Sequence, residues 1–185
     1  SHIISVQTTG HINGLNGDAN RVITRKEMDK VVKQSHPKVE TEQELLHVIP
    51  LSYSVDNMDG VRNPAGLKGH EMTVTAHTVI GEAASLDNVV RAVEGADLSV
   101  RSMVLEPLAS AEAVLSAEEK ETGVVLVDIG GGTSDVAIFS GGVMSHTAVI
   151  PVGGFQFTND LVISLSVPYE AAEEVKVKYG HAIPE

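Results

Sequence analysis

The chain has 185 residues, with 13 Lys and Arg against 25 Asp and Glu, so its net charge is −12 with His neutral. A protein that follows the phosphates of a nucleic acid normally carries a basic surface, and this charge balance excludes that class. Hydrophobic residues make up 42%, enough for a buried core, but Trp is absent and Phe and Tyr number three each, so the core must be aliphatic. The absence of cysteine excludes disulfides, thiolate nucleophiles and Cys-bound zinc. No run approaches the roughly 18 apolar residues of a membrane span.

The first segment predicts strands and one helix. Residues 3–8 and a short piece near His11 have the composition of two strands. Thr24–Glu27 has the pattern of a capping box, which predicts that a helix with one apolar face begins there. We expect this helix to end before Pro37, because proline cannot continue it.

Two further strands and a loop complete this segment. Residues 45–55 predict a long strand, residues 63–69 a loop rich in glycine, and residues 71–80 a strand that alternates between apolar and polar side chains. The order up to this point is strands, helix, strand, strand.

A helical pattern then begins at Ser85, with Gly95 at the position of a residue that ends a helix. Residues 98–105 predict a strand, and Pro107 is well placed in the first turn of another helix. The acidic residues in 117–121 indicate a solvated turn.

The last segment starts with a nearly continuous apolar run, Val124–Ile129, which is typical of a strand covered on both faces. Residues 134–139 and 143–150 are joined at Gly141–Gly142, a hairpin signal. Two helices are predicted after them, at 158–165 and 168–179.

The segment Asp128–Asp135 (DIGGGTSD) carries the most chemistry. Three consecutive glycines let several backbone N–H groups approach one anion, with no Cβ to hold a phosphate away. Asp128 and Asp135 supply the one or two carboxylates that hydrated Mg²⁺ takes together with phosphate oxygens. A second glycine pair, Gly153–Gly154, precedes a helix start, which also favours anions. The alternative is a glycine-rich hairpin in which Asp caps a turn.

Other polar residues have simpler interpretations. Glu106, beside Pro107 at a helix start, is first of all a favourable partner of the helix dipole. His70 and His77 are spaced so that a strand would put them on opposite faces, which favours solvated or hydrogen-bonded histidines over a metal site.

These segments resemble known families. Leu105–Ser110, Asp128–Asp135 and Gly153–Gly154 are similar to motifs of the actin, chaperone and sugar-kinase ATPase superfamily. A more specific resemblance, to the FtsA family of bacterial cell-division proteins, runs almost from end to end. It is carried by His47–Pro50, Tyr53–Asp56, Gly60–Gly66, Gly69, the strand through His77, Ile150–Gly154, Thr158–Asp160, Ala172, Glu173, Lys176, Tyr179 and Gly180.

The resemblance implies a set of site residues for ATP and Mg²⁺. Asp128 and Asp135 would act on Mg²⁺ through water, and Glu106 matches the position that orients or deprotonates the attacking water in hydrolytic members. Glu173 and Lys176 match positions that contact the adenosine. The residues implied to contact the nucleotide are Gly130, Gly131, Gly132, Thr133, Ser134, Gly153, Gly154, Glu173 and Lys176.

The resemblance also implies an α/β, actin-like ATPase fold fragment. Residues 1–84 would form a small strand-helix-strand-strand subdomain for interactions, residues 85–122 part of the first lobe, and residues 123–185 the start of the second lobe with its phosphate loop. A first phosphate loop, the rest of the second lobe and a C-terminal amphipathic helix have no counterpart here. We therefore expect an internal fragment that holds half of a nucleotide site.

The function implied is that of a scaffold with slow ATP hydrolysis at most. It would tether the tubulin-like division protein FtsZ to the inner face of the cell membrane, recruit later division proteins through residues 3–82, and associate with itself. Membrane contact would come only from the C-terminal helix, and no nucleic acid would bind. The alternatives are a phosphoryl-transfer enzyme, such as a sugar kinase or an exopolyphosphatase, and a pilus-assembly homologue.

Overall fold

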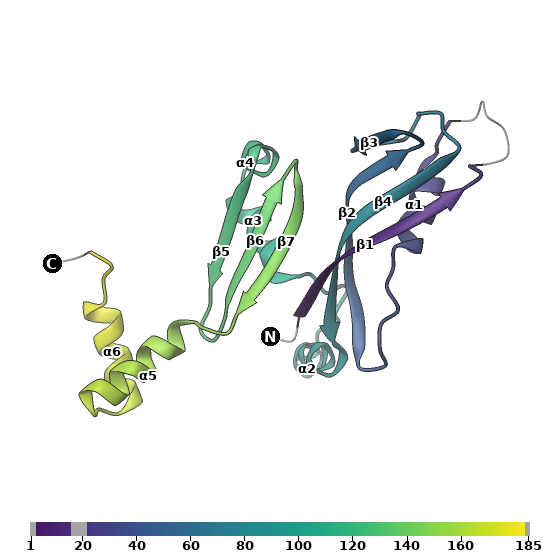
Figure 1. The fold of residues 1–185 in the computed structure, drawn as a ribbon. Coiled ribbons are helices and arrows are strands. Elements are labelled where there is room, and N and C mark those ends of the chain that lie inside the picture. Colours follow the sequence, from purple (N-terminus) through teal and green to yellow (C-terminus); the bar gives the residue numbers. More distant parts are fainter. Residues whose placement is uncertain (1–2, 16–21, 184–185) are drawn as a thin grey trace.

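A computed structural model of the chain describes residues 3–15 and 22–183, which form two antiparallel sheets with helices around them (Figure 1). The elements in chain order are β1 (Ile3–Asn13), α1 (Arg25–Gln34), β2 (Gln43–Val55), β3 (Met58–Val61), β4 (Glu71–Glu82), α2 (Ala83–Glu94), α3 (Glu106–Val114), α4 (Ala117–Thr122), β5 (Val124–Ile129), β6 (Ser134–Ser140), β7 (Val143–Ile150), α5 (Gly154–Leu165) and α6 (Tyr169–Tyr179). The first sheet has the order β1-β4-β2-β3 and the second β5-β6-β7. In Figure 1, α5 and α6 lie beyond one end of the second sheet.

Helix α1 begins at the predicted capping residues. The carboxylate of Glu27 accepts hydrogen bonds from the Thr24 N–H at 2.7 Å and from its hydroxyl at 2.9 Å, which secures the first turn. The helix ends before Pro37, as predicted. Its Val31 is fully buried in the core between α1 and the first sheet. Helix and sheet approach so closely that a Cβ added to Gly10 would lie 2.2 Å from the Val31 carbonyl oxygen.

The first sheet differs from the prediction in two places. Residues 3–13 form one strand rather than two, because the whole of β1 pairs with β4, from Ile3 opposite Gly81 to Asn13 opposite Glu71. The short strand β3 was not predicted. It pairs with the end of β2 and is exposed apart from its last residue, Val61, which is half-buried. Because one face of β3 is not buried, its sequence lacks the alternating pattern that marks a half-buried strand. The small subdomain is therefore strand-helix-strand-strand-strand.

Strand β4 is covered on both faces over its second half. Met72 and Val74 belong to the core under α1, as the predicted alternation requires. His77 and Val79 lie on the opposite face and are also buried, because the second sheet covers that face here. Burial of this polar-looking face is a consequence of tertiary packing, which alternation alone does not predict.

A second core joins the two sheets. Val79 of β4 packs with Leu105, with Ala111 of α3, and with Phe139 and Met144 of the second sheet. This cluster draws residues from all three of the segments 1–84, 85–122 and 123–185. The predicted strand at 98–105 is wrong: these residues are irregular, because no described strand pairs with them and a strand needs a partner for its backbone groups.

Two predictions about the next elements are also wrong. Residues 117–122 form a short helix, since the Ser116 hydroxyl accepts a bond from the Glu119 N–H at 3.2 Å and the Glu119 carboxylate bonds back to the Ser116 N–H at 2.8 Å. Strand β5 is covered on one face only. Its Val125, Val127 and Ile129 are 57%, 53% and 69% exposed, because α3 and the first sheet pack on the opposite face of the second sheet. In the described part of the chain, no helix has the length and apolar character to cross a membrane.

Candidate functional site: the glycine loop and its acids

The glycine loop lies at the end of β5, where the chain turns back into β6. The N–H of Gly130 donates to the Thr133 carbonyl oxygen at 2.9 Å and closes the loop. The N–H groups of Gly131 and Gly132 donate to no described residue, and a Cβ added at either position would meet no heavy atom within 4 Å. The middle of the loop is thus open, with two backbone donors available to an anion.

Helix α5 is docked on the other side of this loop. The N–H groups of Gly154 and Phe155 donate to the carbonyl oxygens of Gly130 and Gly131, at 2.9 and 2.7 Å. A Cβ on Gly153 would lie 2.6 Å from the Gly130 oxygen, so only glycine fits there. The first donors of α5 are therefore engaged by the loop. The structure shows Gly153 and Gly154 as the contact between helix and loop, and their contact with a ligand stays a prediction.

The two predicted acids face each other across β5 and β6. Asp128 is directly opposite Asp135 in the strand pairing, so both side chains project from the same face of the sheet. The Asp128 carboxylate accepts a hydrogen bond from the Ser110 hydroxyl at 2.6 Å, and Asp135 accepts one from the Thr133 hydroxyl at 3.3 Å. Two negative charges directly opposite each other in a sheet repel, unless a cation lies between them.

This pair fits the way in which proteins hold Mg²⁺. That ion keeps most of its water and takes one or two carboxylates, often through water, whereas a closed protein cage needs more ligands. No group of three or more His, Cys, Asp or Glu gathers around a possible metal position within residues 3–15 and 22–183. Two facing carboxylates beside an open loop fit a hydrated magnesium ion and its phosphate, and the binding of both stays a prediction.

Glu106 lies near the glycine loop and Asp135, on a different element of the structure. It is the first residue of α3, and it lines a cavity of about 180 Å³ together with Thr133 and Asp135. The other walls are apolar and come from β1, β2, α2 and residues 103–105. Ser134 lies beside this group, but its hydroxyl donates to the Val152 carbonyl oxygen at 2.7 Å, which ties the loop to the segment before α5.

Glu173 and Lys176 form a second polar group, on α6. The Lys176 Nζ lies 2.7 Å from the Glu173 carboxylate, and it donates to the Gly154 carbonyl oxygen at 3.2 Å and to the Thr158 hydroxyl at 2.8 Å. The Thr158 hydroxyl also bonds to Glu173. The hydrogen bond from Lys176, followed by the one from Thr158, holds the pKa of Glu173 below its ordinary value. This network fastens α6 to the helix that docks on the glycine loop.

Ser110 and Thr158 lie in motifs that carry the family resemblance, but neither was predicted to be a site residue. Both are small hydroxyl residues on helices, and each lies near its acid only after the chain has folded. Thr158 is fully buried, and two signals could have identified it: its place in the segment Thr158–Asp160 and its polar side chain on the inner face of a helix. The two histidines weighed as metal ligands lie apart: His77 contacts Thr147, and His70 lies beside Asp56.

Comparisons with known proteins match both halves of the chain. One family model, described as the SHS2 domain inserted in FTSA, matches residues 1–80, and another, described as Cell division protein FtsA, matches residues 125–185. The FtsA proteins of Buchnera aphidicola and Pseudomonas aeruginosa are each 38% identical to the chain, over 162 and 179 residues. These alignments cover 87% and 94% of this chain and 38% and 43% of the relatives.

A solved structure has a similar fold. The PilM-PilN type IV pilus biogenesis complex aligns with 95% of this chain and 48% of its own, with a TM-score of 0.63 and 21% identity. This similarity confirms the predicted α/β, actin-like ATPase fold. The chain spans about two fifths of the length of the curated relatives that it matches. Since the family models match at both ends and the relatives align over most of its residues, this chain belongs to the FtsA family of cell division proteins.

Proposed function

We propose that the chain carries the phosphate and magnesium side of an ATP site in an actin-like scaffold of cell division. One observation supports this most: the open glycine loop, the facing carboxylates of Asp128 and Asp135, and Glu106 all surround one end of the second sheet. In this proposal the loop N–H groups hold the phosphates, with Thr133 and Ser134 beside them. The two acids hold hydrated Mg²⁺, which neutralises phosphate charge when bound.

The adenosine side is proposed for Glu173 and Lys176. Their network with Thr158 keeps α6 against α5, and α5 is hydrogen-bonded to the loop. ATP bound at the loop would therefore stabilise the arrangement of loop, α5 and α6. A ligand that binds one conformation better shifts the population towards it, which is how ATP would favour an assembly-competent state.

Substitution of Gly131 tests the phosphate site directly. In the full-length protein, we expect Gly131→Val to abolish ATP binding, because the side chain occupies the position of the phosphates. The same side chain meets nothing else within 4 Å of its Cβ, so the variant should unfold in urea at the same midpoint as the wild type. Normal ATP affinity in an equilibrium titration would contradict the proposal.

For the first sheet we propose a binding surface. Residues 3–82 would contact later division proteins or a second copy of the protein. The strand β1 supports this, because it is a long edge strand, and edge strands can pair with other chains.

A point substitution tests this surface better than a deletion does. Removal of residues 1–82 would expose Met144 and other residues of the second core. Val6→Lys on β1, where Val6 is 39% exposed, leaves that core intact. We expect weaker self-association in sedimentation with unchanged ATP affinity. Unchanged self-association with weaker ATP affinity would contradict the assignment of a binding surface to residues 3–82.

A second candidate function is phosphoryl transfer, since Glu106 lines a cavity with Thr133 and Asp135, as a water-positioning acid would. Glu106→Gln separates the two: it should lower phosphate release and leave ATP affinity unchanged in an enzyme. In a scaffold that uses ATP only as a ligand, phosphate release is already negligible in the wild type. The similarity to the pilus complex concerns the fold alone and favours no pilus role.

A further inference from the structure

Asp128 is held by a residue that neither the strand nor the loop supplies. The hydroxyl of Ser110 donates to its Oδ2 at 2.6 Å, within the range of about 2.5–2.7 Å for a strong hydroxyl-carboxylate bond. Ser110 lies on α3, one helical turn after Glu106. A single hydrogen bond thus connects the helix that begins with Glu106 to the strand that leads into the glycine loop.

The two facing acids are engaged in the same way. Oδ2 of Asp128 is taken by Ser110, and Oδ2 of Asp135 by Thr133. The Oδ1 atom of each accepts no hydrogen bond from a described residue. In the described part of the chain no buried side-chain oxygen or nitrogen lacks a partner, so neither Oδ1 atom is fully enclosed, although Asp135 as a whole is only 8% exposed. Each carboxylate therefore presents one free oxygen to the water shell of a cation.

We infer that Ser110 is a positioning residue for the magnesium side of the site, an inference that rests on the proposed ATP function. Its hydroxyl fixes the rotation of the Asp128 carboxylate, so that Oδ1 remains free for the water of Mg²⁺. Without this bond, the repulsion between Asp128 and Asp135 would turn the Asp128 carboxylate away.

The test is an ATP titration of the full-length protein with Mg²⁺ and with EDTA. Ser110→Ala should weaken binding about tenfold with Mg²⁺, the size of one hydrogen bond to a charged group, and leave binding in EDTA unchanged. It should also raise the Mg²⁺ concentration needed for half-maximal binding. Ser110→Thr keeps the hydroxyl and should restore affinity to within about threefold. Ser145→Ala, which removes a hydroxyl from β7 outside the site, is the matched control and should change neither titration.

A double variant shows whether Ser110 acts through Asp128. In an Asp128→Asn background, Ser110→Ala should weaken ATP binding by less than about twofold, because the effects of coupled residues are not additive. Equal losses with Mg²⁺ and EDTA, or additive losses in the double variant, would overturn the inference in favour of a structural role. An unchanged Mg²⁺ requirement in Ser110→Ala would overturn it as well. If the wild-type protein binds no ATP, the proposed function fails and this inference fails with it.

Discussion

The Nε2 atom of His77 lies 3.1 Å from the Thr147 hydroxyl, and this contact joins a central strand of the first sheet to the edge strand of the second. His77 is only 3% exposed. Burial, and then the nearby His146, hold the pKa of His77 below its ordinary value of 6.5. His47 has a related position: it accepts a hydrogen bond from the Leu105 N–H at 3.0 Å, and burial lowers its pKa too.

This arrangement predicts that the chain loses stability in mild acid. The unfolded chain binds protons on these histidines at about pH 6.5, whereas the folded chain resists until a lower pH. The free energy of unfolding should therefore be greatest above pH 6.5 and fall as the pH decreases below it, as measured by urea unfolding from about pH 8 to pH 5. The double variant His47→Gln/His77→Gln should flatten this dependence. Three acids also have lowered pKa values: Asp56, Glu119 and Glu173. Their contribution to stability is lost only below about pH 4.5, so it does not change the free energy of unfolding between pH 8 and pH 5.

Gly153 is predicted to tolerate no side chain. Gly153→Ala would place a Cβ 2.6 and 2.7 Å from the carbonyl oxygens of Gly130 and Gly131, which are backbone atoms held in the loop. We expect a loss of about 1–3 kcal/mol in the free energy of unfolding, as for other overpacked sites. The control is Gly131→Ala, whose Cβ meets nothing within 4 Å and which should unfold at nearly the wild-type urea concentration. Equal stability of the two variants would mean that α5 does not dock on the loop as described.

Gly10 is predicted to be needed for the packing of α1. A Cβ there would lie 2.2 Å from the Val31 carbonyl oxygen and 2.6 Å from the Ser35 nitrogen, so Gly10→Ala must push the helix off the first sheet. The expected cost is about 1–3 kcal/mol in urea unfolding, accompanied by faster amide exchange in α1. Gly132→Ala, at an open position, serves as the comparison. Unaltered exchange in α1 of the Gly10 variant would count against this packing.

The two faces of the second sheet should differ in their response to truncation. Met144 is 1% exposed in the core that joins the sheets, so Met144→Ala should cost about 2–5 kcal/mol. Val125 lies on the opposite face and is 57% exposed, so Val125→Ala should change stability by no more than about 0.5 kcal/mol. Thermal or urea unfolding of both variants measures this contrast. A larger loss of stability from Val125→Ala than from Met144→Ala would mean that the buried core lies on the face of Val125, which would contradict the structure.

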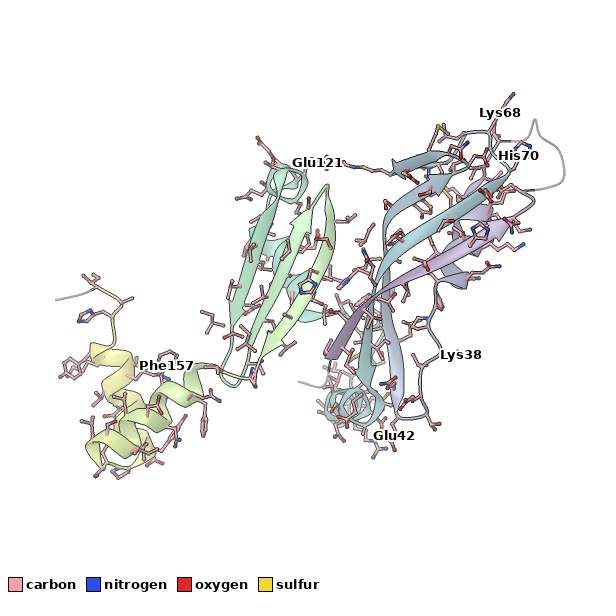
Figure 2. All side chains as sticks on the ribbon, in the orientation of Figure 1. Lys38, Glu42, Lys68, His70, Glu121 and Phe157 are labelled. Carbon is pink, nitrogen blue, oxygen red and sulfur yellow. The ribbon has the colours of Figure 1, made fainter. Side chains whose placement is uncertain are left out.

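An exposed ion pair between the two sheets, Arg62 with Glu121, should contribute little to stability. The guanidinium of Arg62, in the loop after β3, pairs with Glu121 of α4, and Figure 2 shows Glu121 at the end of the second sheet that faces β3. Because both side chains are more than half exposed, water screens their attraction. The contact between the sheets depends instead on the buried cluster around Val79 and Met144.

Local rules were enough for the elements whose cause is local. The capping residues Thr24 and Glu27 predicted the start of α1, and alternation predicted most of β4. The glycine loop and its two acids could also be identified in the sequence, because three consecutive glycines permit a tight turn and a close approach of backbone N–H groups to a ligand. The pairing of Asp128 with Asp135 was not predicted, and it follows from the register of β5 and β6.

What depends on distant contacts was not visible in the same way. Residues 98–105 have the composition of a strand, yet no described strand pairs with them, and the apolar run of β5 is covered on one face only. The sequence by itself predicted the start of α1 and the glycine loop with its two acids, since these depend on residues that are neighbours in the chain. It did not predict α4, and α5 begins at Gly154 rather than at the predicted residue 158. Only the tertiary structure decided that His77 is buried, that Ser110 holds Asp128, and that α5 uses its first N–H groups on the loop. Each of these is a contact between segments far apart in the chain, and no local pattern records which segments will meet.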